Sequence, residues 1–239
     1  MNGLLSGYNA FIQFWFRTIA RASDRALMLP LNENHGVTVY DLSSHMTTAS
    51  LKNYASGADI SWTQGKNHIL GPALNFPGFG TVVELAETEH LATQQFTLEA
   101  WIKATAIDPG VDTIYCIDKY PYGLWLNISS TMNINAAIGD GSELQILQST
   151  TQPQPSEWYH IAITGDSSHF KLYINSVLEN EFNATLTYSA SNPPAALGAS
   201  KIITNYSNYF NGLINHVAAY SRVLTQEEIN ANFSRFNSA

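Results

Sequence analysis

Two neighbouring runs of the 239-residue sequence, YGLWLNIS and MNINAAIG, place one indole ring beside several side-chain amides. If both runs are β-strands, alternation puts Trp125 and Asn127 on the face opposite Leu124 and Leu126. An aromatic ring packs on the apolar face of a sugar, and amides offer donors and acceptors to its hydroxyl groups. The spacing therefore predicts a sugar-binding platform; the alternative is a core tryptophan beside solvent-facing asparagines. The predicted glycan contacts, with two tyrosines of the KYPYG loop at the rim, are Trp125, Asn127, Asn133, Asn135, Tyr120 and Tyr122.

Acidic side chains near these runs offer a second chemistry, the coordination of a cation. The segment GDGSE supplies Asp140 and Glu143, and Asp118 precedes the KYPYG loop. Calcium prefers oxygen ligands, and carboxylates provide them. An Asp-Gly pair is also typical of an ordinary hairpin turn, and this second interpretation is the favoured one.

The other motifs argue against an enzyme. Glycoside hydrolysis needs two carboxylates about 5 to 10 Å apart, but the closely spaced acidic pairs fall in predicted turns, loops or the final helix. A G-x-S-x-G elbow, a Walker loop, an H-E-x-x-H helix and a G-x-G-x-x-G turn are all missing. His160 and His216 lie on predicted strands without an adjacent carboxylate or cysteine, so we interpret both as structural. We expect a protein without catalytic activity.

Composition limits the class of protein and its partners. Hydrophobic residues make up 45% of the chain, which is enough to bury a substantial core. Only 11 Lys and Arg stand against 19 Asp and Glu, and no basic run occurs, so a nucleic-acid partner is not expected. The single cysteine, Cys116, excludes an internal disulfide and is expected to be a buried free thiol.

The first 25 residues form an apolar and aromatic arm. Phe11, Phe14 and Trp15 follow helical spacing and would place a bulky stripe on one side of a helix. The run is shorter than the about 20 residues that span a bilayer, so no membrane span is expected. A secretory signal is an alternative, but no positive charge precedes the apolar run. The stripe would pack on its own domain, or residues 4–19 would dock on a second copy or on a larger assembly.

From residue 26 to 239, short alternating runs separated by Gly, Pro, Asn and Asp predict one all-β domain, a two-sheet antiparallel sandwich. Residues 41–68 are polar and aperiodic, and we interpret them as a surface excursion over one sheet. The run LINHVAAY predicts a strand in which Asn215 and His216 point to opposite faces. One short helix follows it, since Thr225 and Glu228 have the spacing of a capping box.

The order of these segments, from about Ala26 to Phe233, resembles the laminin-G-like, concanavalin A-like jelly rolls, a family that includes the pentraxins. GPALNFPGFGTVVEL resembles the early strand pair of the family, and FTLEAWIK resembles its aromatic-acid-Trp strand. EWYHIAITGDSSHFKLYINSVL resembles a W-x-H-V-A hairpin, and FNGLINHVAAYSRVLTQEEI resembles the closing strand and helix. The resemblance implies a jelly roll with a short C-terminal helix.

The resemblance also implies a structural calcium ion, held by an acidic residue after the early Phe and by an Asp-Glu pair in the closing strand. Pro77 stands at the first position, and Asn215 and His216 stand at the other two. Proline offers no side-chain oxygen and histidine offers nitrogen, which calcium does not favour. We therefore expect this site to be weakened or lost, and we expect no cofactor.

Together these patterns predict a non-catalytic binding module that recognises glycans or a glycosylated surface, located outside the cell or on a virion surface. The alternative is a structural or adhesion component of a larger assembly, such as a virion decoration or fibre protein, anchored through the arm.

Overall fold

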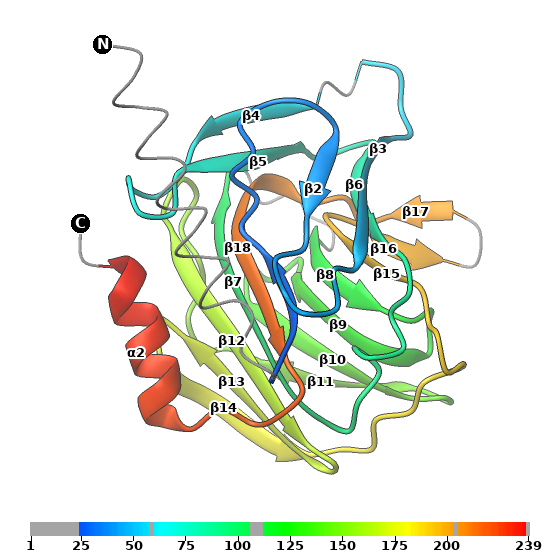
Figure 1. Ribbon diagram of the computed structural model, residues 1–239. Coiled ribbons are helices and arrows are strands. Elements are labelled where there is room, and N and C mark those ends of the chain that lie inside the picture. The colour runs from blue at the N-terminus through cyan, green and yellow to red at the C-terminus, as the bar shows by residue number, and fades with distance from the viewer. Residues whose placement is uncertain (1–23, 58–59, 106–111, 203–204, 238–239) are drawn as a thin grey trace.

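The computed structural model describes residues 24–57, 60–105, 112–202 and 205–237. Over these residues the chain forms two eight-stranded antiparallel sheets, stacked as two layers, and one short hairpin (Figure 1). The predicted all-β sandwich is confirmed. The arm residues Phe11, Phe14 and Trp15 lie outside the described residues.

Sheet A contains the strands on the side of helix α2. In spatial order these are β14 (Val177–Asn183), β13 (His169–Ile174), β12 (Tyr159–Asp166), β7 (Gln95–Ala104), β18 (Asn211–Tyr220), β5 (Pro72–Pro77) and β4 (Ser61–Gln64). Strand β1 (Arg25–Leu29) also pairs with β18. Strand β4 therefore forms one edge of this sheet.

Sheet B forms the opposite layer. Its order is β11 (Leu144–Gln148), β10 (Ile134–Asp140), β9 (Tyr122–Ile128), β8 (Asp112–Ile117), β15 (Ala195–Leu197), β6 (Thr81–Leu85), β3 (Thr48–Asn53) and β2 (Thr38–Tyr40). The hairpin β16 (Ser200–Ile202) and β17 (Asn205–Ser207) follows β15 and stands out from the body of the sandwich (Figure 1).

The main core fills the space between the sheets and follows from the alternation of the strands. Leu98, Ala100 and Ile102 of β7 point into it, as do Leu124 and Leu126 of β9. The intervening residues of these strands point outward. The faces predicted for β9 are thus confirmed, and β7 follows the same alternation.

Helix α2 (Gln226–Asn237) begins at the predicted capping box. The hydroxyl of Thr225 accepts a hydrogen bond from the Glu228 amide at 3.3 Å, and the Glu228 carboxylate accepts one from the Thr225 amide at 2.9 Å. Leu224 and Ile229 are buried on either side of this box. The helix therefore has a fixed start, directly after the last strand.

Strand β18 departs from simple alternation at His216. Its pairing with β7 shifts register between Asn215 and Ala218, and His216 has a positive φ of 49°. Ile214 and Val217 both enter the main core, whereas strict alternation would put them on opposite faces. A β-bulge, which inserts one extra residue into the strand, explains this break in the alternation.

Residues 41–57 and 60–68 contain more regular structure than their composition indicates. They contain β3, which joins sheet B, and β4, which joins sheet A. The interpretation as an excursion over one sheet was therefore wrong. Both strands lie near sheet edges and bury few residues, so they lack a strong hydrophobic period.

In the part of the chain that the structure describes, no helix has the length and apolarity needed to cross a membrane.

Candidate functional site

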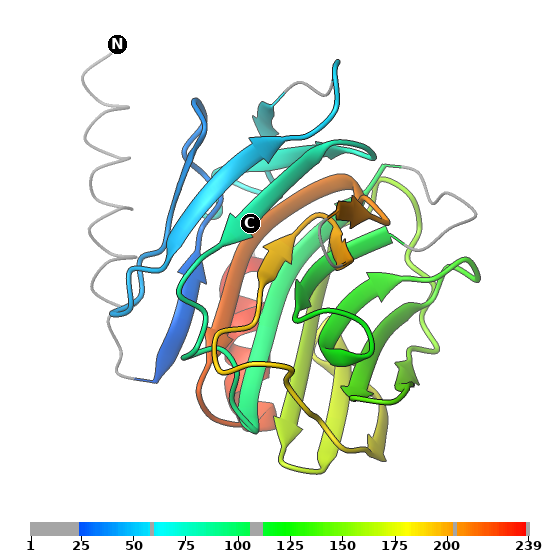
Figure 2. The same cartoon turned by 90° about the vertical axis from the view of Figure 1, so that its right-hand side faces the viewer.

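The two outer faces of the sandwich are covered differently. Helix α2 packs on the outer face of sheet A, where its residues Ile229 and Phe236 share a buried cluster with Trp101 and Tyr220. Figure 2 looks onto the other side of the molecule, where the hairpin β16–β17 lies in front and α2 lies behind. No described helix covers the outer face of sheet B, which makes this face the first place to look for a binding site.

Amides of three adjacent strands form a row on this outer face. Asn127 of β9 lies opposite Asn135 of β10, and Asn135 lies opposite Gln148 of β11. The Gln148 amide nitrogen donates to the Asn135 amide oxygen at 3.3 Å. We call Asn127, Asn135 and Gln148 the amide row. The sequence predicted its first two members on one face, and the edge strand β11 adds the third.

Trp125 lies next to the amide row but below the surface. Its strand neighbours are Cys116 and Ala137, and its side chain is only 7% exposed. It belongs to a small cluster on the outer face that also includes Val82 and Ala196. The indole therefore lies beneath this surface, and its ring is not open for stacking on a sugar.

An exposed ring on the other side of Trp125 from Asn127 is Tyr120, from the loop between β8 and β9. It is 59% exposed and packs edge-on against Trp125, with ring centroids 6.2 Å apart. Tyr122 is half-buried and lies against Gly141, where an added Cβ would come within 2.8 Å of its ring. Tyr120 is thus placed to offer a ring to a ligand, while Tyr122 braces the turn between β10 and β11.

Asn133 is held by the turn that precedes β10. Its amide nitrogen donates to the main-chain oxygen of Ser149 at 2.9 Å, and its amide oxygen accepts from the Thr131 hydroxyl at 2.9 Å. Both ends of this amide are engaged. It positions the end of the amide row and has less capacity left for a ligand.

A second polar and aromatic cluster lies farther across the same face. The hydroxyls of Tyr54 and Tyr206 donate to the same carboxylate oxygen of Glu84, at 2.6 and 2.7 Å. The two rings are 5.2 Å apart, and the Lys201 nitrogen lies 4.3 Å from the centre of the Tyr206 ring. We call Tyr54, Glu84, Tyr206 and Lys201 the Tyr54 cluster. Tyr54 is 54% exposed, so this cluster also presents a ring to solvent.

The hydrogen bonds of the Tyr54 cluster keep its carboxylate ionised. Burial raises the pKa of Glu84, but the hydroxyls of Tyr54 and Tyr206 lower it by more, and the resulting pKa lies below the ordinary value. The same bond to Glu84 raises the pKa of Tyr54 to about 12. The Glu84 carboxylate is therefore negatively charged at neutral pH, and the two tyrosines that donate to it are neutral.

Tyr206 and Tyr209 cover the middle of this face. Both pack against the buried cluster of Trp125, Cys116 and Ala196. The Cys116 thiol donates to the Ala199 carbonyl at 3.3 Å, and burial raises its pKa to about 11. The single cysteine is thus a buried, protonated thiol. The buried cluster around it separates the Tyr54 cluster from the part of the face that carries the amide row.

The acidic residues proposed as cation ligands serve the turns that contain them. One Asp140 oxygen accepts from the Ser142 amide and hydroxyl, both at 2.7 Å, and from the Glu143 amide at 2.9 Å. Asp118 is fully buried and accepts bonds from Lys119 and from Ser189. Among the described residues, no group of three or more His, Cys, Asp and Glu side chains is arranged to hold a metal ion.

The positions of the implied calcium site carry different chemistry. Pro77 ends β5 opposite Asn211. Asn215 is fully buried, and its amide nitrogen donates to the main-chain oxygens of Pro72, Pro30 and Leu31 at 2.6, 3.2 and 3.4 Å. An uncharged donor thus meets three carbonyl oxygens, an acceptor set that would also suit a cation.

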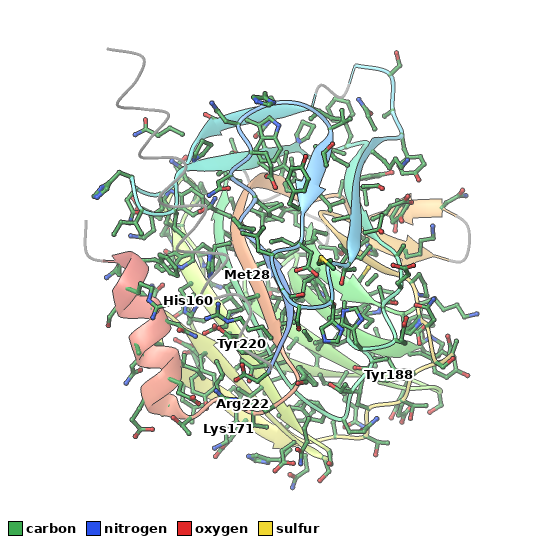
Figure 3. The ribbon with its side chains drawn as sticks, viewed as in Figure 1. Met28, His160, Lys171, Tyr188, Tyr220 and Arg222 are labelled. Carbon is green, nitrogen blue, oxygen red and sulfur yellow. The ribbon has the colours of Figure 1, made fainter. Side chains whose placement is uncertain are left out.

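The most enzyme-like group of side chains is buried under helix α2. Glu99 and His160 are each 2% exposed, with 3.5 Å between the carboxylate and the ring nitrogen. Asn232 of α2 donates to Glu99 at 2.8 Å, and Phe233 stacks on Trp101. His160 lies on the side of sheet A that faces the helix (Figure 3). With α2 in place a substrate cannot reach this pair, so its geometry does not favour catalysis.

A family model described as the concanavalin A-like lectin/glucanases superfamily matches residues 77–230, more than half of the chain. A search of curated protein sequences gave no match.

Solved structures share the fold at low sequence identity. Domain 4 of AbnA, an extracellular GH43 arabinanase from Geobacillus stearothermophilus, was solved in complex with arabinotriose. It superposes with a TM-score of 0.66 at 18% identity, over 87% of this chain and 97% of that domain. The binding domain of Paraclostridial Mosquitocidal Protein 1 gives a TM-score of 0.70 at 13% identity, over 91% of this chain and 53% of that one.

A structure of botulinum neurotoxin type C, whose cell entry depends on two ganglioside molecules, gives a TM-score of 0.65 at 16% identity. It covers 90% of this chain, which in turn spans 51% of that structure. The chain thus corresponds to about half the length of these toxin domains. At such identities the similarity establishes the fold.

Proposed function

The chain belongs to the concanavalin A-like lectin/glucanase superfamily, and on this basis we propose that it is a non-catalytic module that binds glycans through the outer face of sheet B. The observation that carries the proposal is that the amide row and the exposed ring of Tyr120 lie on one outer face, with Trp125 between them. Asn127 and Asn135 are only 5% and 8% exposed and lie beneath the surface, so Gln148 is the exposed member of the row. Its amide offers a donor and an acceptor to sugar hydroxyls, and the ring of Tyr120 offers an apolar surface to a pyranose or furanose.

The described catalytic-type groups support a binding role over an enzymatic one. Glu99 and His160 are enclosed by α2, and Asp140 is engaged in its turn. Carboxylates that could act as a glycosidase pair must face the bound sugar from both sides. Glu84 of the Tyr54 cluster lies on the outer face of sheet B. Its carboxylate already accepts hydrogen bonds from two tyrosine hydroxyls, so it is not placed as one of such a pair.

Structural relatives with related ligands add support at the level of ligand class. The arabinanase domain was solved with a trisaccharide, and the type C toxin depends on gangliosides, which are glycolipids. We extend this to the chain as a proposal: its partner is an oligosaccharide or a glycosylated surface. The extracellular setting of the arabinanase fits a location outside the cell, which we also propose here.

A glycan array, followed by calorimetry with the best oligosaccharide, tests this function. Tyr120→Ala and Gln148→Ala change exposed side chains and should leave the fold intact. Each is expected to weaken binding about tenfold, which corresponds to about 1.4 kcal/mol. Tyr120→Phe keeps the ring and should retain most of the affinity.

The control is Tyr40→Ala, because Tyr40 is 58% exposed and belongs to β2 at the opposite edge of the same sheet. It should bind like the unchanged protein. Bound oligosaccharide should be recovered uncut after long incubation. Equal affinities for Tyr120→Ala, Gln148→Ala and Tyr40→Ala would contradict a site on this face, and cleavage of the ligand would contradict the non-catalytic role.

A further inference from the structure

A separate pocket of about 430 Å³ lies at the edge of sheet A, whereas the amide row belongs to sheet B. It is bounded by edge strand β4, by the turn that leads from β4 into β5, and by the segment before β2. Its described lining residues are Asn34, Trp62, Thr63, Gln64, Gly65, Asn67, His68, Gly71 and Pro72. We call it the Trp62 pocket. Its volume falls within the range of about 300 to 1,000 Å³ typical of small-molecule sites.

The indole of Trp62 forms a fixed apolar wall of this pocket. The ring is half-buried and packs against the main core, and its nitrogen donates to the Gly36 carbonyl at 3.2 Å. Packing and this hydrogen bond together fix the orientation of the ring before a ligand arrives. A surface that is already ordered loses little side-chain entropy on binding.

The turn opposite Trp62 is also rigid. A Cβ on Gly65 would lie 2.1 Å from the Gly71 carbonyl oxygen, so the two ends of the turn touch through their main chains. The Asn67 amide oxygen accepts from the amides of Ile69 and Leu70, and its nitrogen donates to the Phe236 carbonyl at 2.6 Å. Asn67 thus ties the turn to the end of α2 and frames the pocket.

The remaining polar side chains of the pocket are available to a ligand. Asn34, Thr63, Gln64 and His68 are exposed, and each offers a donor, an acceptor or both. None of the described lining residues is Asp, Glu, Lys or Arg. An apolar ring beside amides and a hydroxyl, without a carboxylate, an ammonium or a guanidinium group, matches an uncharged polyhydroxylated molecule better than it matches an anion or a cation.

We propose that the Trp62 pocket binds a single uncharged sugar residue, as a second carbohydrate site. The sugar ring stacks on the indole, and Gln64 with Asn34 meets its hydroxyl groups. The inference shares its ligand class with the proposed function but uses a different sheet and different residues. Two sites on one rigid domain would let a branched or clustered glycan bind at both, which raises the overall affinity.

Nuclear magnetic resonance of the indole N–H groups tests the pocket directly, because the chain has five tryptophans. The probes are L-arabinose, D-galactose, D-glucose and N-acetyl-D-glucosamine at millimolar concentrations, with D-glucuronate as the charged comparison. A neutral sugar is expected to shift the Trp62 signal in a saturable way. Loss of a peak in Trp62→Phe identifies the Trp62 signal. Loss of a peak in Trp158→Phe identifies a comparison signal, from a half-buried tryptophan on the other side of sheet A.

Gln64→Ala removes an exposed side chain and should fold normally, which the unchanged shifts of the other indoles would show. It is expected to weaken the sugar response of Trp62 about fivefold to tenfold, the loss that corresponds to one hydrogen bond of about 1 kcal/mol. Thr225→Ser is a conservative control on an exposed residue outside the pocket.

The Tyr120→Ala variant separates this inference from the proposed function. It should leave the Trp62 response unchanged although it weakens oligosaccharide binding on sheet B. A Trp62 signal that stays unchanged with every neutral sugar would overturn the inference. So would a response that Gln64→Ala leaves intact, that glucuronate produces equally well, or that Tyr120→Ala removes.

Discussion

The side-chain nitrogen of Asn215 lies 2.6 Å from the main-chain oxygen of Pro72, in a buried ring of three carbonyl acceptors. This contact joins β18 to the start of β5 and to the segment after β1. An amide donor satisfies acceptors that a cation would otherwise neutralise. At this position hydrogen bonds of the chain itself therefore satisfy the three carbonyl oxygens.

Asn215→Asp should make the fold depend on a cation. The new carboxylate would face carbonyl oxygens without a donor, and an uncompensated buried charge costs about 3–5 kcal/mol. Calcium would supply the missing positive charge between oxygen ligands. Urea unfolding of the variant is expected to show a loss of this size in chelator and a partial recovery in millimolar calcium.

Asn215→Ala is the matched control for that prediction. It removes the donor without adding charge, so it should lose about 1–3 kcal/mol with no calcium response. If Asn215→Asp were as stable in chelator as the unchanged protein, the carbonyl ring would not have the role assigned to it.

Glu228→Gln should weaken the start of α2 in a pH-dependent way. Arg222 donates two hydrogen bonds to this carboxylate, at 2.7 and 2.6 Å, and the Thr225 amide donates a third. Arg222 first, and then the Thr225 amide, lower the pKa of Glu228 from 4.5 to about 2. Because the folded pKa is depressed, the stabilisation is complete above pH 4.5 and is lost as pH falls toward about 2.

The side chains of Arg222 and Glu228 are 40% and 39% exposed, so solvent screens the pair. The expected loss for Glu228→Gln at neutral pH is therefore only about 0.5–1 kcal/mol in the free energy of unfolding. Glu227→Gln removes the neighbouring exposed charge of the same helix turn and serves as control. A loss of equal size in both variants would assign the effect to the helix dipole, against the specific ion pair.

His216→Asn should make the protein less sensitive to mild acid. His216 is buried, and burial, followed by the charge of Arg25, lowers its pKa from 6.5 to about 3. Below pH 6.5 the unfolded chain binds a proton at this ring that the folded chain does not bind, so stability falls as pH drops from 6.5 toward 3. The slope is up to about 1.4 kcal/mol per pH unit.

Asparagine accepts the positive φ of this position and has no titrating group. The measurement is the free energy of unfolding at neutral pH and at about pH 4.5. The unchanged protein should lose stability between these two pH values, and His216→Asn should show a much smaller loss. His68→Asn, at an exposed site, should keep the full pH response. An identical pH response in all three proteins would contradict a neutral buried His216.

Gly198→Ala should destabilise the fold more than the same change at Gly36. Both residues have positive φ, of 82° and 78°. An added Cβ at Gly198 would lie 2.1 Å from the ring of Phe76, whereas Gly36 has nothing within 4 Å. Gly36→Ala thus carries only the backbone strain, about 1 kcal/mol, and Gly198→Ala adds an overlap worth about 1–3 kcal/mol. Thermal unfolding should separate the two; similar losses would contradict the overlap.

Sequence patterns were most informative where a strand faces the main core on one side. Alternation in β9 was enough to assign its faces, and the capping box at Thr225 located the start of α2. The opposition of Asn127 and Asn135 also follows from alternation once β9 and β10 pair as a hairpin.

The rest depends on contacts that local patterns do not encode. Glu84 meets Tyr54 and Tyr206, which are 30 and 122 residues away in sequence, and no short motif joins them. Trp62 belongs to an edge strand that contains no fully buried residue, so its sequence resembles that of a polar loop. The exposure of Tyr120 and the burial of Trp125 are set by a loop that folds over β9, so alternation alone could not rank the two rings.

The position of helix α2 also makes the two outer faces of the sandwich different, because only the outer face of sheet A is covered by this helix. Copies attached to a support through their α2 side would all turn the outer face of sheet B toward the solution. Weak single contacts to a surface dense in glycans would then multiply into avidity. Copies attached through the hairpin β16–β17 would turn the same face toward the support. The strength of adhesion would thus depend on how the domain is mounted as well as on its affinity for one sugar.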